Sequence, residues 1–149
     1  MTTARTTSDP TPAAASPDCA RDPLSQVCSE VAGLFRRAWG RGPVKTCAYW
    51  CGPSAIVVLL ENGHTDAEKT MRAAGHIQEL LGGRQLLQVL LEDDLTAVVQ
   101  RLVGRPVITM LSATRLDPDM SAEIFLLGPD ASGTAPATSS ADATPAAAG

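Results

Sequence analysis

A cluster of basic and aromatic side chains between residues 36 and 50 is the part of this sequence best suited to bind a ligand. Its members are Arg36, Arg37, Trp39, Arg41, Lys45 and Trp50. Arginine beside an exposed aromatic ring is a combination that contacts phosphates and single-stranded nucleic acids. Cations also favour the C-terminal end of a helix, so a solvated helix end explains the same residues without any ligand. A nucleic-acid- or anion-binding surface here is therefore our alternative functional hypothesis.

Two cysteines and two histidines are the only residues in the sequence that suggest a metal site. Cys47 and Cys51 are separated by three residues, which is within the spacing of zinc sites. Only one such pair exists, however, and His64 and His76 are too far apart for the usual histidine pair. We interpret the cysteines as small apolar residues near a hairpin turn, with metal binding or redox sensing as the alternative. The sequence therefore predicts no metal and no cofactor.

The acidic residues do not form a recognisable catalytic site. The candidate carboxylate groups are Glu92 to Asp94 with Glu61, and Asp117 with Asp119 and Glu123. Neither group is accompanied by a nucleophile with a base, an HExxH motif or a phosphate-binding loop. Asp117-Pro118-Asp119 is typical of a turn and lacks the spaced oxygen ligands of a calcium loop. We expect a protein that is not an enzyme.

Composition divides the chain into one domain and two tails. The chain has 149 residues and a net charge of −4 at pH 7. Residues 1–21 and 130–149 are rich in Ala, Pro, Ser and Thr, and we predict that both segments are disordered. Residues 22–129 form one domain, large enough to bury roughly 60–70% of the surface of the unfolded chain. The mild acidity disfavours generic binding to nucleic acids or anionic membranes.

No segment of the sequence has the character of a signal peptide or a membrane span. The longest continuous apolar run, Ala55–Leu60, has the length of a strand, whereas a membrane helix needs about 20 apolar residues. We therefore expect a cytoplasmic protein whose cysteines are reduced thiols.

Apolar spacing predicts the first helix over residues 23–39. Asp22 supplies an N-cap, Pro23 suits the first helical position, and Gly40 suits the C-terminal end. The apolar stripe consists of Leu24, Val27, Cys28, Val31, Leu34, Phe35 and Ala38.

A capping box from Thr65 to Glu68 predicts the start of a second helix. We expect this helix to break or kink near Gly82-Gly83, because two consecutive glycines weaken a helix. A third helix then follows over residues 84–103, with the largest apolar face in the chain. This apolar arc is wider than one small sheet needs, which indicates a dimer interface. We expect a homodimer.

Four short segments rich in apolar and β-branched residues are predicted strands. They are Val44–Tyr49, Ala55–Leu60, Val107–Leu111 and Ala122–Leu127. Ala55–Leu60 is continuously apolar and suits a central strand, whereas Val44–Tyr49 suits a position nearer an edge. The resulting order, α-β-β-α-α-β-β, predicts a compact single-domain α+β fold. We expect a mainly antiparallel four-stranded sheet with the helices packed on one face.

The order and spacing of several short motifs resemble the MpsC-like family of small bacterial domains. The motifs are Gly40-Arg41-Gly42-Pro43, the apolar strand Ile56–Leu60, Thr65-x-x-Glu68, Gly104-Arg105-x-Val107, and Leu116-Asp117-Pro118-Asp119-Met120-x-x-Glu123-Ile124-Phe125-x-Leu127. The resemblance extends over roughly residues 24–129. One departure is His64-Thr65, where the family usually has Leu-Thr.

The family is named for a proposed Na+-translocating system that generates a membrane potential. The resemblance implies a non-enzymatic accessory or regulatory protein, associated through a protein partner such as a transporter subunit with a membrane ion or inorganic-carbon uptake system. It provides no catalytic residues to transfer. Since the sequence contains no membrane span, we expect that this chain does not itself translocate ions and that it is cytoplasmic and peripheral to the membrane.

Overall fold

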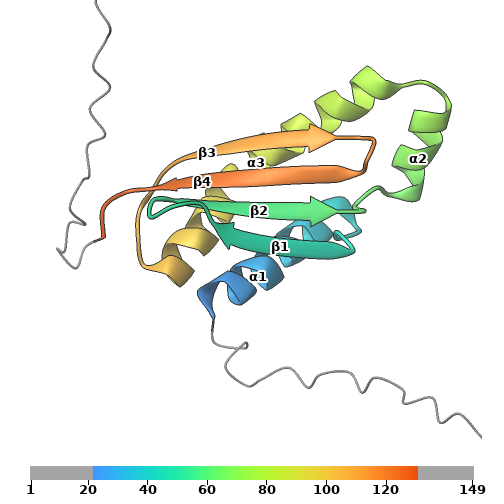
Figure 1. Cartoon of the computed structure of the whole chain (residues 1–149). Helices are drawn as coiled ribbons and strands as arrows, with labels where there is room; N and C mark the ends of the chain where they lie inside the picture. The colour runs from blue at the N-terminus through green and yellow to red at the C-terminus, as the bar shows by residue number, and fades with distance from the viewer. Residues whose placement is uncertain (1–21, 131–149) are drawn as a thin grey trace, which may run out of the picture.

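The first helix begins and ends where the sequence predicts. In the computed structural model, which describes residues 22–130, α1 spans Pro23–Trp39 (Figure 1). The Asp22 side chain accepts a hydrogen bond from the Leu24 amide, and Gly40 ends the helix with φ of 78°. The predicted tails 1–21 and 130–149, except Asp130, lie outside the described residues.

Four antiparallel strands form one sheet in the order β1-β2-β4-β3. Their bounds are β1 Lys45–Trp50, β2 Ala55–Glu61, β3 Val107–Arg115 and β4 Met120–Leu127. β2 is central and β1 lies at an edge, as the apolar patterns indicate. Both hairpin pairs are present, and the predicted α+β fold and element order are confirmed.

The break between the second and third helices lies at Gly75, and the predicted break at Gly82-Gly83 is wrong. α2 spans Asp66–Ala73 and α3 runs without interruption through Ile77–Val103. Gly75 has φ of 86°, a left-handed conformation that glycine adopts without strain. Gly82 and Gly83 lie on the exposed side of α3. Their helix-weakening effect of about 1 kcal/mol each is offset by the packing of the residues on either side.

Two helices cover one face of the sheet and create the core. α1 contacts β1 and α3, α3 contacts β3, and α2 packs against α3 (Figure 1). Because side chains alternate along a strand, every second residue of β2 and β4 points toward these helices. The buried cluster comprises Val27, Val31, Leu34, Ile56, Val58, Leu60, Leu91, Leu95, Val99, Phe125 and Leu127.

The opposite face of the sheet is left uncovered by the described helices (Figure 1). The register places Cys47 and Tyr49 of β1, Val57 and Leu59 of β2, Ile124 and Leu126 of β4, and Leu111 of β3 on this side. We call these seven residues the open sheet face. Its centre is apolar, and Tyr49, Leu111 and Leu126 are exposed by 53%, 55% and 38%.

The two glycine environments predict opposite effects of adding a methyl group. Gly83→Ala should stabilise the protein by up to about 1 kcal/mol, because the position is helical, exposed and free of nearby atoms. Gly75→Ala should destabilise it by about 1 kcal/mol, because alanine is strained at positive φ. Urea unfolding of the two variants and the wild type measures both effects. Destabilisation by Gly83→Ala would contradict a continuous α3.

Candidate functional site

A buried ion pair between Arg84 and Glu68 joins α3 to α2. The Arg84 Nε lies 2.7 Å from Glu68 Oε1, and its Nη2 lies 3.1 Å from Oε2. The two side chains are only 12% and 6% exposed. Glu68 also completes the predicted capping box, since its carboxylate accepts from the Thr65 amide at 2.7 Å. Burial alone would raise the pKa of Glu68, but hydrogen bonds from Arg84, the Thr65 amide and Trp39 lower it to about 2.

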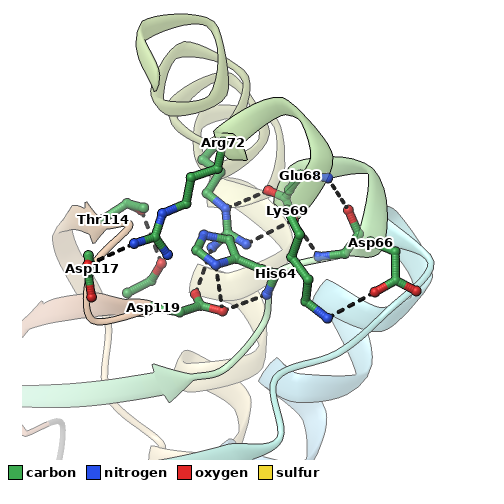
Figure 2. A network of polar contacts seen from close by, with 11 residues as sticks. His64, Asp66, Glu68, Lys69, Arg72, Thr114, Asp117 and Asp119 are labelled. Carbon is green, nitrogen blue, oxygen red and sulfur yellow. Dashed lines mark hydrogen bonds and ion pairs between the residues drawn. The ribbon is translucent and has the colours of Figure 1, made fainter. Parts of the chain in front are cut away.

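Asp119 connects this ion pair to the loop after β2. Its Oδ2 accepts from the His64 amide at 2.7 Å and lies 3.0 Å from His64 Nδ1, as Figure 2 shows. Because an ionised carboxylate only accepts hydrogen bonds, we assign the imidazole proton to Nδ1. Burial lowers the pKa of His64, an effect that the Asp119 carboxylate opposes and the Arg84 guanidinium reinforces, and this shift favours the neutral ring. Its Nε2 is buried without a hydrogen-bond partner in the described structure.

A small cavity opens beside Arg84 and has a volume of about 30 Å³. The residues that line it are Phe35, Trp39, Arg41, Pro43, Leu60, Gly63, Arg84, Leu87, Gln88, Thr114, Asp119 and Ser121. Arg84 lies over the Trp39 ring, with its guanidinium carbon 5.9 Å from the ring centroid, and its Nη1 is 3.8 Å from Asp119 Oδ1. A cavity of this volume has room for a water molecule.

Glu123 is a fully buried carboxyl group in the core between α3 and the sheet. Gln88 donates to its Oε1 at 2.8 Å, and the Ser112 hydroxyl donates to its Oε2. Both partners are neutral. Burial raises the pKa of Glu123 to about 7, because these two hydrogen bonds only partly offset the loss of water. From the sequence we considered Glu123, Asp117 and Asp119 as one candidate carboxylate group. In the structure Asp117 is 81% exposed in the β3–β4 turn, where it pairs with Arg72 (Figure 2), whereas Glu123 is buried.

The basic and aromatic cluster predicted from the sequence is spread over different parts of the fold. Trp39 and Arg41 meet at the cavity. Lys45 pairs with Glu61 at 3.0 Å, and Trp50 lies at the other end of β1, 47% exposed. Arg36 and Arg37 are exposed in the last turn of α1. The structure therefore brings some of the six residues together and separates Trp50 from the rest.

The cysteine and histidine candidates are also separated. Cys47 lies in β1 and Cys51 in the turn before β2, whereas His64 follows the far end of β2. Cys28, Cys47 and Cys51 are free thiols, and Cys19 lies outside the described residues. Within residues 22–130, no group of three or more His, Cys, Asp or Glu side chains is placed to hold a metal ion.

A second exposed apolar surface lies on α3, on the side away from the sheet. Leu86, Val89 and Leu90 are 60%, 66% and 69% exposed. We call these three residues the α3 stripe. The apolar residues predicted to form one broad arc on this helix therefore belong to two sides of it. Leu91 and Leu95 face the core, whereas the α3 stripe is exposed. We did not predict the open sheet face from the sequence, although the outward positions of β2 and β4 are as apolar as the inward ones.

The family model for MpsC, described as a Na+-translocating membrane potential-generating system, matches residues 23–128. The chain belongs to the MpsC family. The resemblance in the sequence is confirmed, and the match extends over almost all of the described residues. No curated protein and no solved structure matches the chain.

Membrane insertion of the described helices can be judged from their length and polarity. α3 has 27 residues, but no helix within residues 22–130 is both long and apolar enough to span a bilayer.

Replacing Glu123 tests the buried carboxyl group. Its pKa in the folded protein, about 7, exceeds its ordinary value of 4.5, so its ionisation destabilises the fold as pH rises through this range. Glu123→Gln keeps both hydrogen-bond partners and should match wild-type stability near pH 4 and exceed it by about 3 kcal/mol at pH 8. Urea unfolding at both pH values measures this, with the exposed Glu92→Gln as control. An equal effect at both pH values would contradict the assignment.

Proposed function

We propose that this MpsC protein is a non-enzymatic accessory protein that binds other proteins of a membrane ion-transport system. The observation that supports it best is the open sheet face. In α+β domains an apolar sheet face is normally covered by helices or a second sheet, and within residues 22–130 helices cover only one of the two faces. The largest exposed apolar patch of a protein domain is often an interaction site.

The association with a membrane system follows from the family description alone. On this proposal the protein acts from the cytoplasmic side of the membrane and is peripheral to the bilayer. The polar network around Arg84 and His64 consists of side chains held in ion pairs, and the cavity beside it has a volume of about 30 Å³. These features favour a structural role for the network and an interaction role for the protein.

We further propose that the protein is a homodimer joined through the open sheet face. Four strands about 4.8 Å apart and about seven residues long outline a rectangle of roughly 450 Å². The solvent-accessible area of the sheet face exceeds this flat outline, because side chains project from it. The area is therefore near the roughly 600 Å² per partner at the lower end of specific interfaces. The centre of the face has no charged side chain, so two copies meet without burying charge. A twofold axis makes one such face complementary to itself.

A nucleic-acid- or anion-binding role remains the second candidate. The observation in its favour is that none of the ion pairs in the described structure involves Arg36, Arg37 or Arg41. These three cations are free to contact a phosphate, although Lys45 and Trp50 do not join them.

Analytical ultracentrifugation at tens of micromolar tests the dimer. The wild type should sediment as a dimer, and Leu111→Lys/Leu126→Lys should sediment as a monomer, because two lysines would be buried without partners in the interface. Both leucines are exposed in the single chain, so the variant should fold. Leu90→Lys is the matched control on α3 and should remain dimeric. A monomeric wild type would contradict the proposal.

Affinity purification from native cells tests the accessory role. Tagged protein, purified with and without detergent-solubilised membranes and analysed by mass spectrometry, should recover an integral membrane protein of a transport system. Recovery of nucleic acid or only soluble proteins would contradict the proposal. Loss of the nucleic acid in an Arg36→Ala/Arg41→Ala variant would then support the second candidate.

A further inference from the structure

The α3 stripe has the geometry of a docking site for a helix. Leu86, Val89 and Leu90 are separated by three and four positions, so they lie next to one another on one side of α3. Exposed Gly82 precedes them and exposed Ala97 follows them on the same side. Small residues at both ends allow a second helix to approach closely along the stripe. The core lies on the opposite side of α3, so the stripe lies outside the core of the single chain.

Acidic residues border this stripe at both ends. Glu79 lies before it, and Glu92, Asp93 and Asp94 lie directly after it, all exposed. The only described partner of Glu79 is His76, at 3.4 Å, and none of the ion pairs in residues 22–130 involves the other three. The border is therefore negatively charged.

The cations of α3 are directed elsewhere. Arg84 is turned inward to Glu68, and Arg101 pairs with Glu30 of α1. No other lysine or arginine occurs in Ile77–Val103. Nothing on this helix therefore neutralises the acidic border of the stripe.

This charge pattern disfavours binding of a second copy of the chain at the α3 stripe. Two α3 stripes placed together would double the number of carboxylates around one small apolar contact, with no cation from either side. Like charges brought together at an interface oppose association. A basic partner gains from the same pattern, because its cations approach carboxylates of which three, Glu92, Asp93 and Asp94, take part in no ion pair within residues 22–130.

We propose that the α3 stripe binds an amphipathic helix of a partner protein, with apolar anchors flanked by lysines and arginines. The anchors at i, i+3, i+4 and i+7 would pack on Leu86, Val89 and Leu90, and the flanking cations would pair with Glu79 and Glu92 to Asp94. Positively charged segments next to membrane spans are common on the cytoplasmic side of membrane proteins. The inference therefore rests on the proposed accessory function and gives the chemistry of its partner.

A designed peptide provides the probe. We would use a fluorescein-labelled amphipathic helix of about five turns, or 18 residues, with a leucine stripe flanked by lysines, and measure anisotropy against full-length protein. A second peptide with glutamate in place of each lysine is the charge control. The wild-type protein should bind the lysine peptide at least tenfold more tightly, and this preference should weaken with added salt.

Two sets of variants separate the apolar contact from simple charge attraction. Leu86→Gln/Leu90→Gln changes no charge and should weaken binding of the lysine peptide at least tenfold. Glu92→Gln/Asp93→Asn/Asp94→Asn should weaken it severalfold and reduce its salt dependence. Leu111→Lys/Leu126→Lys, on the open sheet face, should bind as the wild type does at equal chain concentration. All exchanged residues are exposed, and circular dichroism checks that each variant is folded.

The outcomes that overturn the proposal are distinct from failure of the dimer. Undiminished binding by Leu86→Gln/Leu90→Gln would show attraction by charge alone, and equal binding of the two peptides would remove the role of the acidic border. Either result would overturn the docking site while the oligomeric state stayed as measured. Conversely, a monomeric wild type that still binds through Leu86 and Leu90 would overturn the dimer and leave the docking site intact.

Discussion

The buried guanidinium group of Arg84 is the interaction on which the arrangement of the helices depends. It pairs with Glu68 of α2, lies near Asp119 beside the β3–β4 turn, and packs over Trp39 at the end of α1. Removing one member of such a pair leaves an uncompensated buried charge, which typically costs about 3–5 kcal/mol. The pair therefore stabilises the observed rotation of α3 about its axis, together with the core residues Leu91, Leu95 and Val99. That rotation places Gln88 and Leu91 in the core and leaves Leu86, Val89 and Leu90 on the outside.

The two exposed apolar surfaces follow from this arrangement and differ in charge. The open sheet face is neutral at its centre, and the α3 stripe has an acidic border. Because α3 packs on the covered side of the sheet, the two surfaces point in opposite directions. A dimer joined through the sheets would present one α3 stripe on each outer side. Such a molecule would be suited to bridge two copies of a partner.

Features that depend on neighbouring residues were predictable from the sequence. The Asp22 cap, the capping box at Thr65 and the four strands are set by local hydrogen bonding and apolar spacing, and all are present. Features that depend on distant residues were not. The continuity of α3 through Gly82-Gly83 comes from packing, and the pairing of Arg84 with Glu68 joins residues in different helices. The buried position of Glu123 could have been inferred from its place in the alternation Ser121, Glu123, Phe125, Leu127, in which every second residue of β4 points inward.

Site-specific photo-crosslinking in native cells tests the central claim most directly. A photoreactive amino acid in place of Leu126 reports on the open sheet face, and one in place of Leu90 reports on the α3 stripe. Our account predicts that position 126 crosslinks to a second copy of the chain and that position 90 crosslinks to a basic segment of a membrane protein. Crosslinks from position 90 to a second copy, or from neither position to any protein, would contradict it.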